Sequence, residues 1–142
     1  MDPAKALALC HEHATAEAAG EIDRVLATMV AEPVFQFFPV AGALSGRQKI
    51  ERFYREFYPR FAERVLGYEM LNEWTNEAGA LQEYVVDVDT GDGGKVTYWV
   101  MSLMPADDES GLLQGERVYS DEGFVRDLLG AMFDLLEPIP TH

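Results

Sequence analysis

Residues 43–61 read ALSGRQKIERFYREFYPRF, and this stretch decides the fold. Its large apolar side chains recur at spacings of three and four residues, which places them on one face of a helix; they are Ile50, Phe53, Tyr54, Phe57 and Phe61. Ser45 and Gln48 have the spacing of a capping box, so the helix is expected to begin at Gly46. Pro59 is expected to end it, because the residue before a proline avoids the α conformation.

Further helices and strands are predicted on both sides of this stretch. Residues 2–19 and 21–31 have helical spacing, with Gly20 as the stop between them, and residues 33–40 (PVFQFFPV) form a strand bounded by two prolines. Residues 41–44 are expected to turn the chain into the central helix. Alternating apolar residues then predict strands at 65–75, 79–89, 95–104 and 112–119, and a short helix follows Asp121.

This order of elements predicts an α+β fold formed by residues 1–142 as a single domain. A flat sheet could not cover the aromatic face of the helix, so the sheet must curl around it. We therefore expect a cone-shaped, curved antiparallel sheet wrapped around a long helix, with three N-terminal helices and a short C-terminal helix. Cones of this kind usually enclose a pocket.

Composition restricts the classes of partner. The formal charge of −14 disfavours nucleic acid, anionic membranes and acidic substrates. No apolar run approaches the roughly 20 residues needed to span a bilayer. The N-terminus lacks the basic region of a secretory signal, and the single cysteine, Cys10, excludes an internal disulfide and fits a reducing cytoplasm. We therefore expect a cytoplasmic protein whose partner is an uncharged or apolar small molecule.

Three sequence segments and the order of the strands resemble the nuclear transport factor 2-like superfamily, and within it the SnoaL-like polyketide cyclase group. The segments are AAGEIDRVLATMVAEPVFQFFP (18–39), LSGRQKIERFYREFYPRF (44–61) and GLLQGERVYSD (111–121). The resemblance implies a homodimer that forms through the exposed face of the sheet. It does not select an activity, since this fold hosts isomerases, cyclases, dehydratases, epoxide hydrolases and non-enzymatic carriers.

Motifs of individual relatives argue against three of these activities. The resemblance to ketosteroid isomerases puts Phe38 where their general base stands, and a phenyl ring cannot abstract a proton. Limonene epoxide hydrolases use two aspartates bridged by an arginine; Asp121 could correspond to the aspartate of the terminal strand and Asp87 or Asp89 to the other, but no arginine lies on that strand to hold the pair. Scytalone dehydratase needs a histidine pair.

Only His11 and His13 are available for such a pair besides the C-terminal His142, and residues two apart on a helix point to different faces.

The resemblance to polyketide cyclases makes Asp121, in the motif YSD, the best match to the acid–base aspartate of that group. Such an aspartate could move a proton on a carbon next to carbonyl groups without a metal or cofactor. Asp121 also directly precedes a helix and is a natural N-cap, with Glu122 favoured in the first turn. His13 could join Asp121 as an acid–base set, or it could be a structural histidine.

Aromatic and sulfur side chains on the predicted strands and helix are candidates for the lining of the pocket; they are Tyr54, Phe38, Trp74, Tyr84, Tyr98, Trp99, Met101 and Tyr119. Tyr98 and Trp99 alternate faces, so one of them must point inward. On the last strand Arg117 and Tyr119 share one face, and Glu116 lies on the other. No cluster of Cys, His or carboxylate residues has metal-ligand spacing, so neither a metal nor a cofactor is expected.

Three hypotheses of different classes follow. The first is a cofactor-free cyclase or isomerase that acts on an apolar carbonyl compound through Asp121, with His13 or Tyr54 in support. The second is a non-catalytic protein that binds an apolar small molecule. The third is an interaction module in which the sheet forms a homodimer, and a homodimer is expected under each of them.

Overall fold

The computed structural model describes residues 1–140. Its helical segments are α1 (Pro3–Ala18), α2 (Ile22–Ala27), α3 (Arg47–Arg52), α4 (Tyr58–Arg64) and α5 (Glu122–Leu129), with a π-helical segment at Phe53–Phe57 and a 3₁₀ segment at Gly130–Leu135. Its strands are β1 (Met29–Phe38), β2 (Gly42–Ser45), β3 (Val65–Asn76), β4 (Gly79–Asp89), β5 (Lys95–Asp107), β6 (Leu112–Tyr119) and β7 (Glu137–Pro138). None of these helices is both long and apolar enough to cross a membrane.

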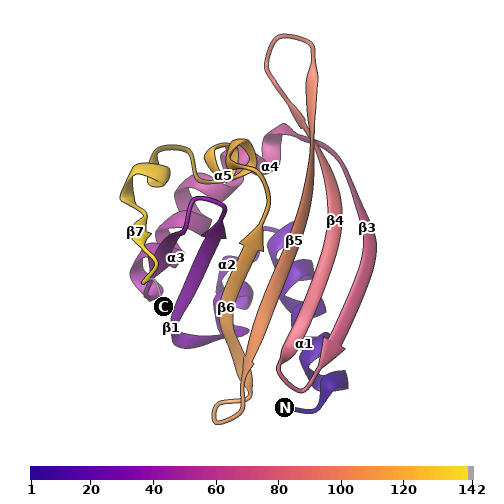
Figure 1. Cartoon of the computed structure of the whole chain (residues 1–142), viewed down its shortest axis with the longest axis vertical. Coiled ribbons are helices and arrows are strands. Elements are labelled where there is room, and N and C mark those ends of the chain that lie inside the picture. The colour runs from indigo at the N-terminus through magenta and orange to yellow at the C-terminus, as the bar shows by residue number, and fades with distance from the viewer. Residues whose placement is uncertain (141–142) are drawn as a thin grey trace.

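The strands of the described residues form one seven-stranded sheet in the order β3-β4-β5-β6-β1-β2-β7 (Figure 1). The expected α+β architecture is confirmed, with one correction to the expected antiparallel sheet. β1 runs parallel to β6, with Phe35 opposite Glu116 and Phe37 opposite Val118. This parallel pair connects the N-terminal part of the sheet to the β3–β6 meander.

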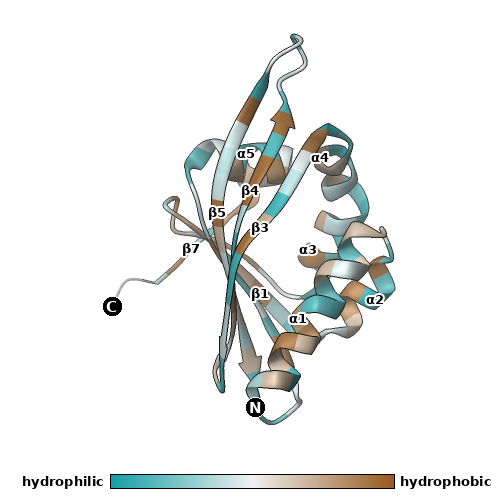
Figure 2. Cartoon of the chain, turned by 90° about the vertical axis from the view of Figure 1, so that its right-hand side faces the viewer, coloured by the Kyte–Doolittle hydropathy of each residue, from teal (hydrophilic) through white to brown (hydrophobic). Residues whose placement is uncertain are grey.

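The helices α1 to α4 lie on one side of the curved sheet, and within residues 1–140 no helix covers its other face (Figure 2). The strands alternate accordingly. On β5, Tyr98 and Val100 are buried beneath the helices, whereas Trp99 is 68% exposed on the open face. The prediction that Tyr98 and Trp99 point to opposite faces is thus confirmed.

The central helix starts at Gly46 as predicted, with Gly46 as its N-cap, but its end and its capping partner differ from the prediction. It continues through Pro59 to Arg64, because the π-helical segment widens the turn just before the proline: the Tyr58 N–H donates to the Phe53 carbonyl, five residues back. A widened turn accommodates a residue that has no N–H to donate. The expected capping box is also wrong. Ser45 lies in β2, and a carboxylate oxygen of Glu32 accepts the Arg47 N–H instead, at 3.1 Å.

Two boundaries near β1 also need correction. The second helix ends at Ala27 rather than Ala31, and the strand begins at Met29, before the proline expected to bound it. Residues 42–45, part of the expected turn, form β2, which pairs with β1 from Val34 to Phe37. In both places strand pairing, rather than the local sequence preference, determines the secondary structure.

Candidate functional site

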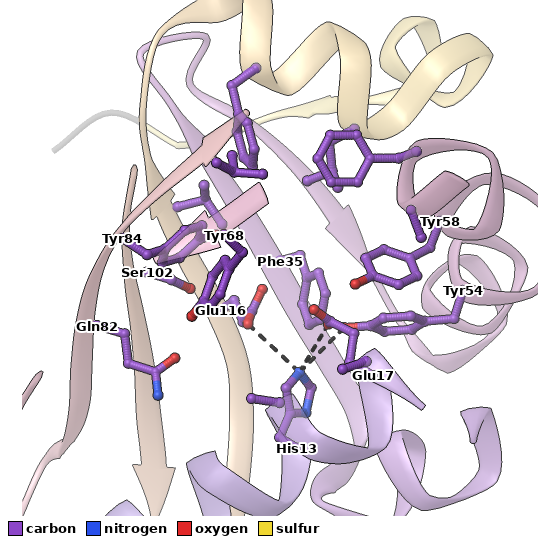
Figure 3. A pocket seen from close by; sticks show the side chains of 18 of the residues that line it. His13, Glu17, Phe35, Tyr54, Tyr58, Tyr68, Gln82, Tyr84, Ser102 and Glu116 are labelled. Carbon is purple, nitrogen blue, oxygen red and sulfur yellow. Dashed lines mark hydrogen bonds and ion pairs between the residues drawn. The ribbon is translucent and has the colours of Figure 1, made fainter. Parts of the chain in front are cut away.

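A cavity of about 380 Å³ lies between α1, the central helix, α5 and the concave face of the sheet (Figure 3). Much of its wall is apolar, and the larger apolar side chains that line it are Phe35, Phe37, Phe53, Phe61, Met104, Val118 and Phe124. Polar side chains gather at one end; they are His13, Glu17, Tyr54, Tyr58, Tyr68, Gln82, Tyr84, Ser102 and Glu116. The cavity therefore suits a molecule with a broad apolar body and a polar group at one end.

The tautomer of His13 follows from its hydrogen bonds. The Thr28 hydroxyl donates to the Val25 carbonyl at 2.6 Å, so its only hydrogen is used. His13 Nδ1, 2.8 Å from the same hydroxyl oxygen, must therefore be the donor of that bond. Burial lowers the pKa of His13 to about 4, so the ring is neutral near pH 7. Its Nε2 then presents a lone pair to the cavity.

Two carboxyl groups flank this lone pair. His13 Nε2 lies 3.7 Å from Glu17 Oε2 and 3.6 Å from Glu116 Oε1 (Figure 3). Glu17 is one helical turn beyond His13 on α1, and Glu116 reaches the cavity from β6. The Tyr54 hydroxyl donates to Glu17 Oε2 at 2.8 Å and lies 3.3 Å from His13 Nε2. These four groups lie at the centre of the polar end, and they come from α1, the central helix and β6.

The two carboxyl groups have different protonation states. Burial and the negative charge of Glu17 raise the pKa of Glu116 to about 8. Burial also raises the pKa of Glu17, but hydrogen bonds from Tyr54 and Tyr58 oppose that rise. Two close carboxylates resist ionising together, and the better-solvated one ionises first. Near pH 7 Glu116 therefore holds a proton, and the hydrogen bonds from Tyr54 and Tyr58 favour Glu17 as the carboxyl group that carries the negative charge.

Other polar groups complete this end of the cavity. Gln82 donates from Nε2 to Glu73 at 2.8 Å, which fixes the orientation of its amide. The Ser102 hydroxyl faces Glu116 and opposes the rise in its pKa, but it makes no hydrogen bond of ordinary geometry within residues 1–140. Burial and the charge of Glu17 raise the pKa of Tyr54 well above its ordinary value, so this hydroxyl remains a donor.

Comparison by sequence gives no relative: no family model matches the chain, and neither does any curated protein. Comparison by structure is informative. A nuclear transport factor 2-like protein of Cytophaga hutchinsonii superimposes with a TM-score of 0.65 at 11% identity, over 80% of this chain and 97% of that one. The chain has the nuclear transport factor 2-like fold.

Two other proteins of similar structure have named activities. An LEH-like epoxide hydrolase of M. tuberculosis is 21% identical over 94% of this chain and 96% of its own, with a TM-score of 0.65. A candidate SnoaL-like polyketide cyclase of Shewanella denitrificans is 13% identical over 89% and 97%, also with a TM-score of 0.65. At these identities the likeness concerns the nuclear transport factor 2-like fold and not the reaction.

Three of the residues predicted for the site line the cavity of this nuclear transport factor 2-like fold: His13, Tyr54 and Tyr84. Asp121 is not among the described lining residues. Its carboxylate accepts the Phe124 N–H at 2.8 Å and so caps α5, which is the alternative that the sequence left open. The structure therefore does not bring Asp121 together with His13.

The remaining predicted lining residues lie elsewhere. Phe38 stacks on Tyr119 with ring centroids 4.8 Å apart, and Met101 is the neighbour of Tyr119 across the β5–β6 pair. Trp74 and Trp99 are exposed by 49% and 68%. Tyr98 is buried, but its hydroxyl donates to Asp127 outside the cavity lining of residues 1–140. These side chains were predicted from residue type alone, without knowledge of which strand face is concave.

Sequence reasoning missed the two glutamates as functional candidates, although weak signals existed for both. Glu17 follows His13 by four residues, so the two share a helical face. Glu116 was predicted to lie opposite Arg117 and Tyr119, and the structure confirms this alternation: it points into the cavity while Tyr119 is exposed. Within residues 1–140, no group of three or more His, Cys, Asp or Glu side chains is arranged to hold a metal ion.

Proposed function

We propose that this protein is a cofactor-independent acid–base enzyme, a cyclase or isomerase that acts on a small, largely apolar carbonyl compound. One observation carries the proposal: Glu17 and Glu116 flank the His13 lone pair at the polar end of an otherwise apolar cavity. An ionised and a protonated carboxyl group side by side supply the base and the acid that such chemistry needs at neutral pH.

The roles follow from the protonation states. Ionised Glu17, held in place by Tyr54, takes a proton from the carbon next to the carbonyl group. Protonated Glu116 gives its proton to the carbonyl oxygen, so an enol forms and no net charge is created. Both protons are then returned. An isomerisation is complete when one of them is delivered to a different carbon, and a cyclisation is complete when they are returned after ring closure. His13 lies within 3.7 Å of both carboxyl groups and positions them.

Exchange of hydrogen for deuterium tests this proposal without knowledge of the product. We expect the protein to catalyse exchange at the carbon next to the carbonyl of mono- and bicyclic ketones in D₂O, measured by NMR. Glu17→Gln should lower the rate by about 100-fold or more, because it removes the base. Asp121→Asn is the matched control, since asparagine also caps a helix. The proposal fails if Glu17→Gln exchanges ketones at the wild-type rate, or if Asp121→Asn loses as much activity.

The apolar wall favours a second candidate, a protein that binds an apolar molecule without converting it. Five phenylalanine side chains, from β1, the central helix and α5, line that wall. Binding of the same ketones with no exchange above the buffer rate would support this alternative over the enzyme.

We also propose that the face of the sheet without helices forms a homodimer. Trp99 is 68% exposed there, and the stacked pair of Phe38 and Tyr119 lies on the neighbouring strands beside Met101. A contiguous apolar surface of this kind is typical of a protein interface, and tryptophan often contributes much of its binding energy.

Sedimentation velocity at micromolar concentration is expected to show a dimer that Trp99→Asp converts to a monomer. Loss of a central tryptophan costs an interface about 2 kcal/mol or more, which weakens association by roughly 30-fold. Leu66→Asp is the control, because Leu66 is similarly exposed, at 61%, on the edge strand β3. A wild-type protein that sediments only as a monomer would disprove the dimer.

A further inference from the structure

We propose that the cavity binds a hydrophobic amine as its ammonium cation, with the charged nitrogen between Glu17 and Glu116 and the apolar body against the phenylalanine wall. The inference rests on the same cavity but goes beyond the proposed function, because the ammonium nitrogen takes the place between the two carboxyl groups that the proposed function gives to the carbonyl compound. It names a class of ligand that the composition of the chain, taken alone, did not suggest.

The charges around the cavity favour a cation. Among the described lining residues are the carboxyl groups of Glu17 and Glu116 but neither lysine nor arginine. His13 adds a lone pair rather than a positive charge, because its Nδ1–H is committed to Thr28. The whole chain carries a formal charge of −14, so its long-range field attracts cations and repels anions. None of the described lining residues would neutralise an anionic ligand here.

The hydrogen-bonding groups point to the same ligand. Ser102 is only 3% exposed and lines the cavity, yet within residues 1–140 its hydroxyl oxygen has no partner (Figure 3). An ammonium group offers three N–H donors and no acceptor. The polar end offers matching acceptors in the two carboxyl groups, in His13 Nε2 and in this unpaired hydroxyl. A neutral alcohol or ketone would leave several of them without a donor.

Aromatic rings surround the same end of the cavity. Tyr58, Tyr68 and Tyr84 lie around the carboxyl groups, with Tyr54 beneath Tyr58 (Figure 3). The face of an aromatic ring attracts a cation, most strongly where water is excluded. The side chains of Glu17 and Glu116 are only 26% and 17% exposed, so water screens the carboxyl groups little. Rings and carboxylates together therefore select for positive charge.

Binding of a cation should also change the protonation of the site. Without a cation, burial and then the charge of Glu17 raise the pKa of Glu116 to about 8, so this group is protonated near pH 7. An ammonium between them allows both carboxyl groups to ionise, so a proton leaves as the amine binds. The other titratable groups that face Glu116 are Cys10, His13, Glu17, Tyr54, Tyr58, Tyr68 and Tyr84.

Apart from Glu17, which belongs to the carboxyl pair itself, these neighbours do not change their charge near neutral pH. Burial raises the pKa of Cys10 to about 12 and lowers that of His13 to about 4. The pKa values of the four tyrosines are all raised. An alkylamine remains protonated below about pH 9. A dependence of affinity on pH between pH 6 and pH 8 would therefore report the carboxyl pair.

Titration calorimetry with 2-phenylethylamine tests the inference, with 2-phenylethanol as the neutral ligand of the same size. We expect the amine to bind at least about tenfold more tightly at pH 8, with its affinity rising by up to about tenfold per pH unit from pH 6. Measurements in buffers of different ionisation enthalpy should show the release of a proton. Glu116→Gln should weaken binding of the amine by about tenfold or more, remove its pH dependence and so reduce the preference for the amine over the alcohol.

Glu83→Gln is the control, because Glu83 alternates with the cavity-lining Gln82 and Tyr84 and bonds Asn72 outside the cavity. Circular dichroism checks that each variant is folded, and Glu17→Gln provides a second arm if Glu116→Gln is not. Equal affinity for the amine and the alcohol, or no amine binding at millimolar concentration, would overturn the inference. If ketone exchange depends on Glu17 but the amine and the alcohol bind equally, only the ammonium inference is overturned. If the amine binds selectively but no ketone exchange occurs, only the proposed function is overturned.

Discussion

Replacement of Glu116 by glutamine is expected to raise the free energy of unfolding at pH 8 by several kcal/mol. Glutamine has nearly the same shape, and its amide can donate to the lone pair of His13, 3.6 Å from the present carboxyl oxygen. The free energy of unfolding increases because the folded wild-type protein disfavours the ionised form of the Glu116 carboxyl group. Its pKa is raised from 4.5 to about 8, first by burial and then by Glu17.

The sign of the effect follows from the proton bound in each state. Below pH 4.5 Glu116 is protonated in both the folded and the unfolded chain, so it contributes no pH dependence. Between pH 4.5 and pH 8 the unfolded chain loses this proton while the folded protein keeps it. The stability of the wild type then falls by about 1.4 kcal/mol per pH unit, to a limit of about 5 kcal/mol. Glutamine does not titrate, so its advantage over glutamate grows across this range.

Urea denaturation at pH 4.5, 6 and 8 measures this difference. His13 changes stability in the opposite direction, since its lowered pKa makes the folded state bind fewer protons, but it is present in both proteins and cancels in the comparison. Glu83→Gln should show no such trend. A difference that stays constant with pH, or a less stable variant at pH 8, would mean that Glu116 is not held protonated in the folded protein. If the trend is confirmed, Glu116 lowers the stability of the folded protein, which is typical of residues in functional sites.

Replacement of Gly115 by alanine is expected to destabilise the protein by about 3 kcal/mol or more. Gly115 has a φ of +132°, a conformation that L side chains rarely adopt, and a Cβ atom there would lie 2.1 Å from the carbonyl oxygen of Val34. The backbone strain and the clash add, because neither can relax without separating β1 from β6. Gly115 lies opposite Val34 in this parallel pair and immediately precedes Glu116, so the variant should also disturb the cavity.

Gly91→Ala separates the two contributions. Gly91 also has a positive φ, +84°, but nothing lies within 4 Å of a Cβ atom at that position. This control should lose only the conformational part, about 1 kcal/mol. Thermal or urea unfolding of both variants gives the comparison. If Gly115→Ala proves no less stable than Gly91→Ala, the close approach of the two strands is not as the structure has it.

The sequence alone predicted those features that depend on local spacing. The aromatic stripe from Ile50 to Phe61 identified the central helix, and the alternation of Tyr98 and Trp99 identified opposite faces of one strand. The predicted bounds of two strands, 79–89 and 112–119, agree with β4 and β6. Each of these features arises within one element, so its period can be read without knowledge of the partner.

Features that depend on distant partners could not be predicted in this way. The helix N-terminus looked capped by Ser45 but is bound by Glu32, because β2 places Ser45 in the sheet. The pairing of Glu17 with Glu116 depends on β6 lying beneath α1, and no local pattern shows that. Glu116 lies opposite Phe35 of β1, beyond an irregularity in the β1–β6 register between Met29 and Val34 that no local pattern shows. Acidic residues on a strongly acidic chain gave no reason to single out these two.

The parallel pairing of β1 with β6 also determines the order in which the molecule can be assembled. β1 cannot obtain this neighbour until the chain has been made as far as Tyr119, after the central helix and the β3–β5 meander. Contacts between segments so far apart in sequence give a high contact order, which slows folding. A growing chain on the ribosome would thus hold β1 with one exposed edge, and the cavity would close among the last events of folding.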